Sequence, residues 1–342
     1  MKVFCDFHHG ALARSMWYLF ADRLGHDFYF PTIQCAVQTG AGPVGTWGCP
    51  GDDAWPKVGF PDGVSPKRCE YEEFRDGQWD IMLLTRRESE EVFKAHGHPR
   101  PGITYIGVSG NEGTRYNRKF VHHLIATDLA SFHMAYPGTK KIHTLQELGR
   151  RFDTGFHPIT EEYLHTVRTY MCNLSGFGIN IAPRHFPGGS PGVNVYQMWQ
   201  EMAAALPDYT FMPHGHGNEK LGGTSEMDMN LPQFYYNSAL SWHFKTYEGY
   251  GHSLLQSLPS GRPVIVPERF YDDRTAGRFL IEGETAFHCD YSSASMIEVV
   301  KRVTVNLETA NHYAKACYDA YKRLFDWQAE AERVRQWLAE TV

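Results

Sequence analysis

The residues with the clearest chemical potential lie between positions 247 and 267. Glu248 precedes a glycine-rich turn, Gln256 follows eight residues later, and the apolar run 263–267 comes next. A helix that begins on a glycine turn presents free backbone N–H groups with a partial positive charge, which suit an anion. A carboxylate and an amide on either side of that anion can hold hydroxyl groups. The pattern predicts a site for a phosphate between two polyhydroxylated groups, as in a nucleotide sugar. The turn residues are Gly249, Tyr250, Gly251, His252 and Ser253.

Two other turns in the second half follow predicted strands and add candidate phosphate contacts. Arg184 comes after the strand predicted at 179–182, and a guanidinium can bind two phosphate oxygens at once. Gly215 and Gly217 follow the strand predicted at 209–212, where glycines let a ligand approach the backbone closely. Histidines flank these glycines, but no third metal ligand is near in sequence, so we expect no metal site there.

In the first half, His8, His9 and Gly10 follow a strand predicted at 2–7. A histidine at this place can act as a general base toward an acceptor hydroxyl or contact the donor phosphate. The alternative is a pair of polar residues that cap the following helix. Weaker candidates for contacts with an acceptor lie in later loops, and they are Trp47, Asn111, Glu112 and Arg115.

The Glu248–Gln256 spacing, followed by Ser260-Gly261 and Pro263-Val264-Ile265, resembles the donor-binding signature of GT-B glycosyltransferases. The resemblance is to the retaining family-4 type, also called glycosyl transferases group 1. It implies that Glu248 lies by the transferred sugar and that residue 256 contacts the ribose. The family has Glu at this second position and the chain has Gln256, whose amide can still hydrogen-bond a diol.

The resemblance also implies that Arg184 neutralises the diphosphate leaving group. The family's lysine one turn later is missing, because the chain reads Gly-Ser-Pro-Gly at 189–192. Backbone N–H groups of this turn are one substitute. The alternatives are Lys220, Lys245 or Arg262. Where the family often places a sugar-contacting histidine in the first domain, the chain offers only Asn111 or Glu112.

Short apolar segments alternate with amphipathic ones throughout, which predicts parallel sheets with helices on both faces. We expect an α/β fold of two doubly wound Rossmann-like domains facing across a cleft, with the C-terminal helix crossing back to the first domain. The predicted ranges are 1–155 for acceptor binding, 156–320 for the nucleotide sugar and 321–342 for the last helix.

In the first domain the predicted strands are 2–7, 27–30, 80–84, 103–108, 124–127 and 141–145. A helix is predicted at 12–24, and the long loop at 39–67 is interpreted as an ordered lid or acceptor loop. In the second, predicted helices include 161–173, 195–206, 231–239, 253–258, 275–281 and 292–306, between strands that include 179–182, 209–212, 240–244, 263–266 and 285–288.

Composition places the chain among ordinary globular proteins. Its 342 residues allow two domains, and 42% hydrophobic and 21% charged residues are typical values. The formal net charge of −6 provides no global attraction to nucleic acid or anionic lipid. Seven scattered cysteines without CxxC spacing fit free thiols in a reducing compartment, and no apolar run is long enough for a bilayer. We therefore expect a cytoplasmic protein with no stable membrane insertion.

The expected function is transfer of a sugar from a nucleoside-diphosphate sugar to an acceptor hydroxyl, with retention implied by the resemblance. No bound cofactor or metal is expected, because the nucleotide sugar, taken as a UDP-sugar, is a co-substrate. The acceptor stays open among a polysaccharide, a small molecule and a modified nucleic-acid base. Two alternatives remain: a sugar-nucleotide 2-epimerase of the same fold, and a non-catalytic relative that binds a nucleotide sugar or nucleic acid.

Overall fold

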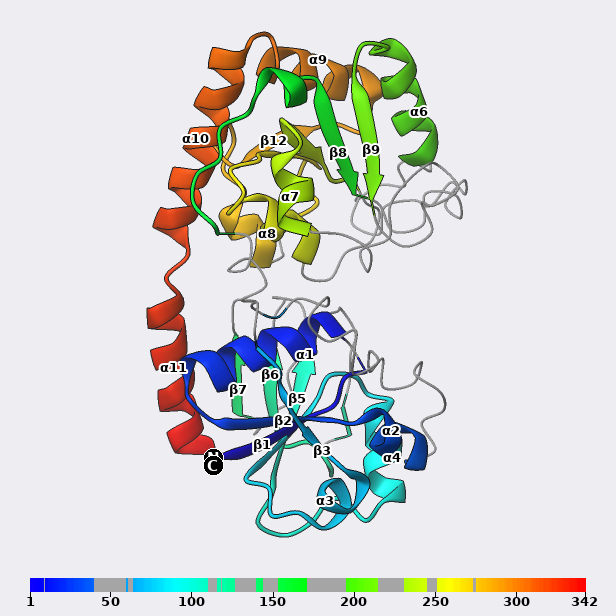
Figure 1. The fold of residues 1–342 in the computed structure, drawn as a ribbon, viewed down its shortest axis with the longest axis vertical. Helices are drawn as coiled ribbons and strands as arrows, with labels where there is room; N and C mark the ends of the chain where they lie inside the picture. The colour runs from blue at the N-terminus through cyan, green and yellow to red at the C-terminus, as the bar shows by residue number, and fades with distance from the viewer. Residues whose placement is uncertain are drawn as a thin grey trace. The chain divides into compact units, whose positions relative to one another are not determined.

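A computed structural model describes residues 1–8, 10–39, 60, 64–109, 116–117, 119–126, 140–143, 153–170, 195–214, 231–244, 251–272 and 275–342. The chain forms two compact units (Figure 1). Unit 1 comprises Met1–Leu148 and Asp326–Val342, and unit 2 comprises Gly149–Phe325. The sequence places these boundaries after residues 155 and 320. In the structure residue 320 lies inside a continuous helix, α10, which spans Leu307–Leu324, and the chain changes unit just after that helix ends.

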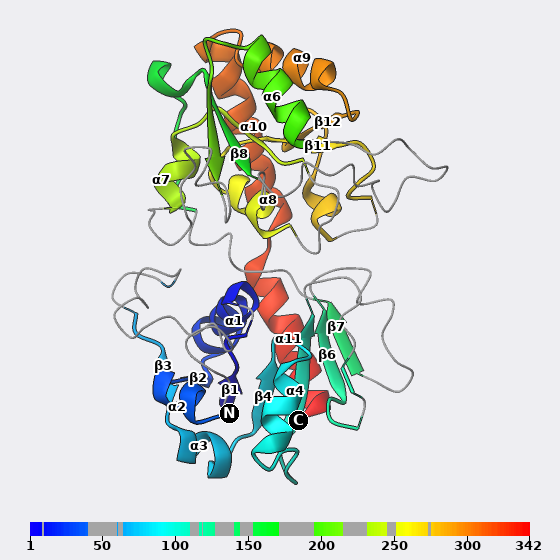
Figure 2. The ribbon, with the colours of Figure 1, turned by 90° about the vertical axis from the view of Figure 1, so that its right-hand side faces the viewer.

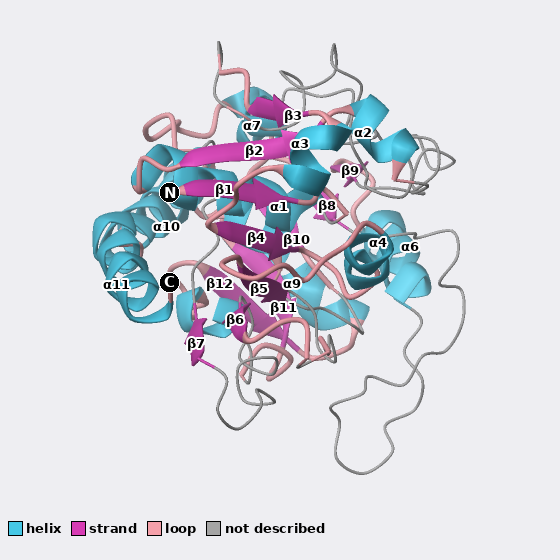
Figure 3. Cartoon of the chain, turned by 90° about the horizontal axis from the view of Figure 1, so that it is seen from below, coloured by secondary structure: helices cyan, strands magenta, loops and turns pink. Residues whose placement is uncertain are grey.

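Unit 1 contains a fully parallel seven-stranded sheet in the order β3-β2-β1-β4-β5-β6-β7, which Figure 3 shows strand by strand. Connections run in one direction from β1 through β3 and in the other from β4 through β7, so β1 and β4 flank the point where the order reverses. The strands are β1 (Lys2–Cys5), β2 (Asp27–Pro31), β3 (Lys67–Cys69), β4 (Ile81–Leu84), β5 (Thr104–Ser109), β6 (His123–Ala126) and β7 (Lys140–His143).

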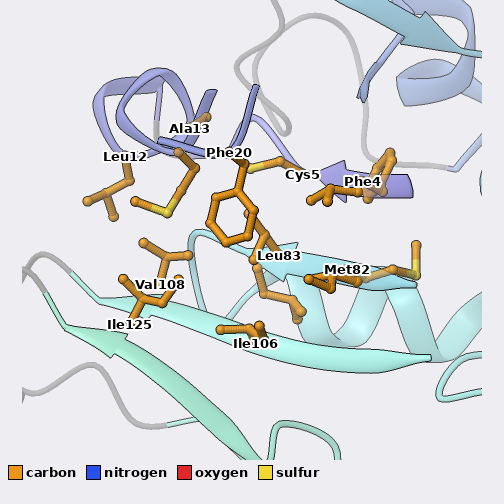
Figure 4. Packing of buried hydrophobic residues seen from close by; sticks show 14 of the residues in the cluster. Phe4, Cys5, Leu12, Ala13, Phe20, Met82, Leu83, Ile106, Val108 and Ile125 are labelled. Atoms are coloured by element: carbon orange, nitrogen blue, oxygen red, sulfur yellow. The ribbon is translucent and has the colours of Figure 1, made fainter. Parts of the chain in front are cut away.

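Helices cover both faces of this sheet. Figure 2 shows α4 in front of it and α11 behind it. The core that they enclose is rich in aromatic and branched residues, and Figure 4 shows Phe4, Phe20, Leu83 and Val108 among them. The helices are α1 (Gly10–Trp17), the π-helix η1 (Tyr18–Arg23), α2 (Ile33–Gln38), α3 (Tyr71–Asp76), α4 (Ser89–Ala95) and α11 (Trp327–Thr341).

Helix α11 belongs to unit 1 although it ends the chain. Its residues Val334, Trp337 and Leu338 are buried in the core of that unit, and the helix contacts η1 and β7. Asp326 begins the helix by accepting a hydrogen bond from the Ala329 N–H. The expectation that the last helix packs on the first domain is therefore confirmed.

Unit 2 contains a parallel five-stranded sheet in the order β12-β11-β10-β8-β9, so the order reverses between β8 and β10. Its strands are β8 (Thr166–Tyr170), β9 (Thr210–His214), β10 (Leu240–Trp242), β11 (Val264–Pro267) and β12 (Ala286–Cys289). Its helices are α6 (Val195–Ala205), α7 (Leu231–Tyr236), α8 (His252–Ser257), α9 (Ser293–Val303) and α10, with 3-10 turns η4 (Glu161–Tyr163) and η7 (Thr275–Phe279).

The two faces of this second sheet differ in character. Val167 and Trp242 lie in an apolar core with residues of α6, α9 and α10. Because side chains alternate along a strand, Arg168 and Ser241 belong to the opposite face, where they meet residues of α7 and α8. One face is therefore a conventional hydrophobic layer, and the other carries a buried polar network.

The alternating pattern is confirmed in unit 1, where every predicted strand with described residues is present. The helix predicted at 161–173 is wrong. Its described part forms the short turn η4 and then strand β8, because the β-branched residues Thr166, Val167 and Thr169 fit a buried position between β9 and β10. The helix predicted at 275–281 is a 3-10 turn instead. The strand predicted at 179–182 lies outside the described residues.

Candidate functional site

The carboxyl ends of the strands around each reversal point are where ligands bind in open parallel sheets. In unit 1 these ends lead into Asp6–His8 after β1 and into Thr85 after β4. In unit 2 the described ends are those of β8, β10 and β11, and helix α8 follows β10. Each unit therefore has one candidate binding region at this edge of its sheet. In unit 1 it contains Asp6–His8 and Thr85, and in unit 2 it contains the start of α8.

The glycine turn at the start of α8 forms as predicted. Gly251 has φ 85° and ψ 44°, a left-handed conformation that glycine adopts without steric cost. Its carbonyl accepts the first helical hydrogen bond, from the Leu255 N–H at 3.0 Å. A Cβ atom added to Gly251 would lie 3.5 Å from the Ala276 Cβ atom and 3.7 Å from a ring carbon of Tyr271. The turn is therefore backed by the segment that follows β11.

Gln256 has a defined partner on α7. The side-chain Oε1 atom of Gln256 accepts a hydrogen bond from the Tyr235 hydroxyl at 3.0 Å, and the carbonyl of Ser253 lies 2.9 Å from the same hydroxyl. Tyr235 is completely buried, whereas Gln256 is partly exposed. Gln256, the predicted ribose-contacting residue, is therefore hydrogen-bonded to a buried side chain of unit 2. The Ser253 side chain is buried, so only the backbone of Ser253 is available to the anion site predicted at this turn.

Arg168 is the residue that the sequence analysis missed. It is fully buried in β8, and its guanidinium donates to the Tyr235 hydroxyl at 2.7 Å and to the Ser241 hydroxyl at 3.2 Å. The guanidinium carbon also lies 3.8 Å from the centroid of the Tyr235 ring, within cation–π range. The incorrect helix prediction at 161–173 hid this residue, because only a strand places it opposite Ser241 in the sheet.

Arg262 does not substitute for the missing phosphate-binding lysine. Its side chain is fully buried and donates to the carbonyls of Ser238, His157, Ser260, Gly261 and Tyr236, at distances from 2.6 to 3.3 Å. Burial lowers the pKa of Arg262 to about 10, so the group is still a cation at neutral pH. Because its donors are engaged by backbone carbonyls, Arg262 links the turn before β11 to the backbone at His157, Tyr236 and Ser238.

A further arginine lies at the carboxyl end of β11. Arg269 is exposed and has φ 59°, a left-handed conformation that residues with a Cβ atom rarely adopt. Backbone strain of this kind costs on the order of 1 kcal/mol and is concentrated near functional sites. The residue adds a positive charge to the loop that backs Gly251.

In unit 1 the reversal point is built around Asp6. Its carboxylate is fully buried, and it accepts hydrogen bonds from the His8 N–H at 3.1 Å, the Thr85 N–H at 2.9 Å and the Thr85 hydroxyl. These bonds tie the end of β1 to the end of β4. The backbone of His8, a predicted catalytic residue, is thereby held at the carboxyl edge of the sheet, and α1 begins two residues later at Gly10.

Burial dominates the titration of both groups. It raises the pKa of the Asp6 carboxyl, and the hydrogen bonds from Thr85 and His8 oppose that rise. Burial lowers the pKa of His8, the charge of Asp6 opposes this effect, and the charge of Arg86 adds to it. A histidine with a lowered pKa is neutral at pH 7 and can accept a proton, as a general base must.

Several predicted site residues lie outside the described residues: His9, Trp47, Asn111, Glu112, Arg115, Arg184, Gly215, Gly217, Glu248, Gly249 and Tyr250. For His252 the structure gives the backbone alone, as the first residue of α8. Within the described ranges, no group of three or more His, Cys, Asp or Glu side chains is arranged to hold a metal ion. Across those same ranges, no helix combines the length and apolarity that crossing a bilayer requires.

Solved structures of similar fold match the whole chain. Sucrose-phosphate synthase from Thermosynechococcus elongatus has a TM-score of 0.62 at 10% identity, over 99% of this chain and 98% of that one. HepE from Anabaena, solved in complex with UDP and glucose, has a TM-score of 0.59 at 10% identity, over 99% of both chains. The lipopolysaccharide outer core galactosyltransferase WaaB, in its apo form, has a TM-score of 0.55 at 10% identity, over 100% of both chains.

These similar structures are GT-B glycosyltransferases, and the chain accordingly has the GT-B fold, as its sequence predicts. No protein-family model matches the sequence, and no curated protein matches it. At 10% identity the likeness shows the fold alone.

Proposed function

We propose that the protein is a glycosyltransferase that moves a sugar from a nucleoside-diphosphate sugar to an acceptor hydroxyl. The observation that carries the proposal is the Gly251 turn at the start of α8, with Gln256 partly exposed on the same helix. This turn follows β10 in a unit of parallel-sheet topology, within a chain of GT-B fold. The HepE structure, which holds UDP and glucose, supports UDP as the nucleotide.

In the proposed reaction the nucleotide binds to unit 2. Backbone N–H groups at the start of α8 face the diphosphate, with Arg184 as a further cationic contact, and Gln256 bonds the ribose. Stabilising the departing diphosphate lowers the barrier, because negative charge develops there in the transition state. Glu248 lies by the transferred sugar, and neutral His8 accepts the proton of the acceptor hydroxyl. Retention, a UDP-sugar as donor and the absence of a resident metal complete the proposal.

The direct test measures release of nucleoside diphosphate from a panel of UDP- and GDP-sugars, with EDTA present. The acceptor panel contains oligosaccharides, small polyols and DNA with hydroxymethylated bases. We expect release with one donor only when an acceptor is present, and a loss of at least about 100-fold in Glu248→Ala. Glu284→Ala is the matched control, because this partly exposed residue pairs with Arg323 before β12, remote from the carboxyl ends of the strands.

Three outcomes would contradict the proposal. Nucleotide release that no acceptor stimulates, formation of an epimerised nucleotide sugar, or full activity in Glu248→Ala would each assign the chain another chemistry or another site. Dependence of the rate on added divalent metal would contradict the metal-free part alone.

A further inference from the structure

The polar face of the sheet in unit 2 contains two hydrogen-bond chains that start at one buried side chain. From Arg168, one chain runs through the Tyr235 hydroxyl to Gln256 and to the Ser253 carbonyl. The other runs through the Ser241 hydroxyl to the Ser257 hydroxyl, 2.7 Å away, and on to the Arg262 carbonyl at 2.8 Å. Ser253 and Ser257 lie in the first and last turns of α8, so both ends of this helix are linked to β8 through Arg168.

The chemistry of arginine fixes the direction of the bonds that Arg168 makes. A guanidinium has five donors and no acceptor, so the hydroxyls of Tyr235 and Ser241 must accept from it. Tyr235 then has one proton left, which it donates to the Gln256 Oε1 atom or the Ser253 carbonyl. In the structure the Tyr235 proton is directed to the Gln256 Oε1 atom at 3.0 Å, so the amide oxygen faces the hydroxyl and the NH2 group lies on the other side. The network therefore orients the Gln256 side chain with its oxygen toward the interior.

The outward side of that amide is the NH2 group. Gln256 is partly exposed, and among the described residues its Nε2 atom donates to no partner. A donor presented in this way can bond an acceptor on a ligand, and the oxygen of a ribose hydroxyl is such a group. Because the amide is held in one orientation before the ligand arrives, less rotamer freedom is lost on binding.

We propose that Arg168 and Tyr235 are positioning residues of the donor site, which hold α8 on the sheet and present the NH2 group of Gln256 to a nucleotide hydroxyl. This inference rests on the proposed function. Neither residue contacts the reacting atoms. Both act through α8 and Gln256, so they affect how tightly the nucleotide binds and leave the chemical step to other groups.

A double-mutant cycle tests the proposal by measuring the Kd for UDP in the full chain. Tyr235→Phe keeps the ring over the guanidinium and removes the hydroxyl, and we expect UDP binding about fivefold weaker. Gln256→Ala should weaken binding about tenfold. The double variant should bind no more weakly than Gln256→Ala, because Tyr235 acts through that side chain.

Tyr209→Phe is the matched control. The Tyr209 hydroxyl also makes a partly buried side-chain hydrogen bond in unit 2, with the Thr304 hydroxyl at 2.8 Å. Tyr209 precedes β9, however, so it lies at the opposite end of the strands from the proposed donor site. We expect this variant to lose a similar amount of stability to urea and to bind UDP as the wild type does. Arg168→Lys provides a second variant, since it keeps the charge but cannot reach both hydroxyls; it should also weaken UDP binding about fivefold.

The outcomes separate the two proposals. Wild-type affinity in Tyr235→Phe, or losses that multiply in the double variant, would overturn the positioning role and leave the glycosyltransferase proposal standing. A wild-type chain that binds no UDP would overturn the proposed UDP-dependent function and this inference with it. Weaker binding in Tyr209→Phe to the same degree would show that the effect is general destabilisation, which also overturns the positioning role.

Discussion

A buried carboxylate at the end of β1 defines the first domain's site at the scale of single residues. Asp6 accepts three hydrogen bonds, from Thr85 and from His8, in a position that water does not reach. Such bonds offset part of the cost of burying a charge, and the pKa of Asp6 nevertheless stays above its ordinary value. The residue therefore orders the turn that places His8, at some expense in stability at neutral pH.

The pH dependence of stability follows from this shift. The folded-state pKa of Asp6 is raised above its unfolded value, so the folded protein binds the proton more tightly. The contribution of Asp6 to the free energy of unfolding is fully present below the unfolded pKa, near 3.8, and is lost as pH rises through the folded pKa. We expect Asp6→Asn to lower the free energy of unfolding by about 1–3 kcal/mol in acid, because the NH2 group of the asparagine faces hydrogen-bond donors. The difference in unfolding free energy between variant and wild type should become smaller toward neutral pH.

Urea unfolding of both proteins between pH 4.5 and 7.5 measures that gap. Asp80→Asn is the control, since this carboxylate is exposed and lies at the other end of β4. Its profile should run parallel to that of the wild type. A constant difference between Asp6→Asn and wild type at every pH would show that Asp6 does not titrate differently in the folded state.

Single residues also mark the limit of prediction from sequence. Gln256 could be singled out because its spacing from Glu248 is a local pattern. Its partners Tyr235 and Arg168 could not, because the contact joins three elements that are distant in the chain. A lone arginine within a polar-looking segment carries no signal of burial, and only the register of β8 against β10 brings it beneath α8.

At the scale of elements, the strongest predictions came from segments with one consistent pattern. The predicted strand 80–84 is apolar after Asp80, the predicted strand 263–266 is apolar throughout, and the structure confirms both as β4 and β11. The segment 161–173 has apolar residues at helical spacing and β-branched residues at alternate positions, so two patterns compete. Tertiary pairing with β9 and β10 decides in favour of the strand, which a local pattern cannot reveal.

The turn before α8 yields a prediction about backbone conformation. Gly251→Ala places a Cβ atom at φ 85° with only ordinary contacts around it, so the cost, about 1–2 kcal/mol, comes from the left-handed backbone. Gly283→Ala has the same kind of cost at φ 76°, in open space before β12. We expect equal losses of stability to urea, with UDP binding about tenfold weaker in Gly251→Ala alone. Unchanged affinity in both variants would remove the turn from the binding site.

For the whole molecule, the two units repeat one design with different strand orders. Each has a parallel sheet whose order reverses once, and each has a polar group beside that reversal, Asp6 in unit 1 and Arg168 in unit 2. The sequence predicts this plan because alternation of strands and helices extends over the entire chain. It places the change of unit only approximately, because α10 and α11 are both amphipathic helices and only their packing assigns them to different cores.

Hydrogen–deuterium exchange of the full chain with and without UDP tests the central claim most directly. If the nucleotide binds at the carboxyl edge of the sheet in unit 2, amides of residues 251–257 gain protection, and those of the Gly283 turn do not change. A chain in which UDP leaves 251–257 unprotected, or protects only residues 1–148, would contradict the placement of the donor site on α8.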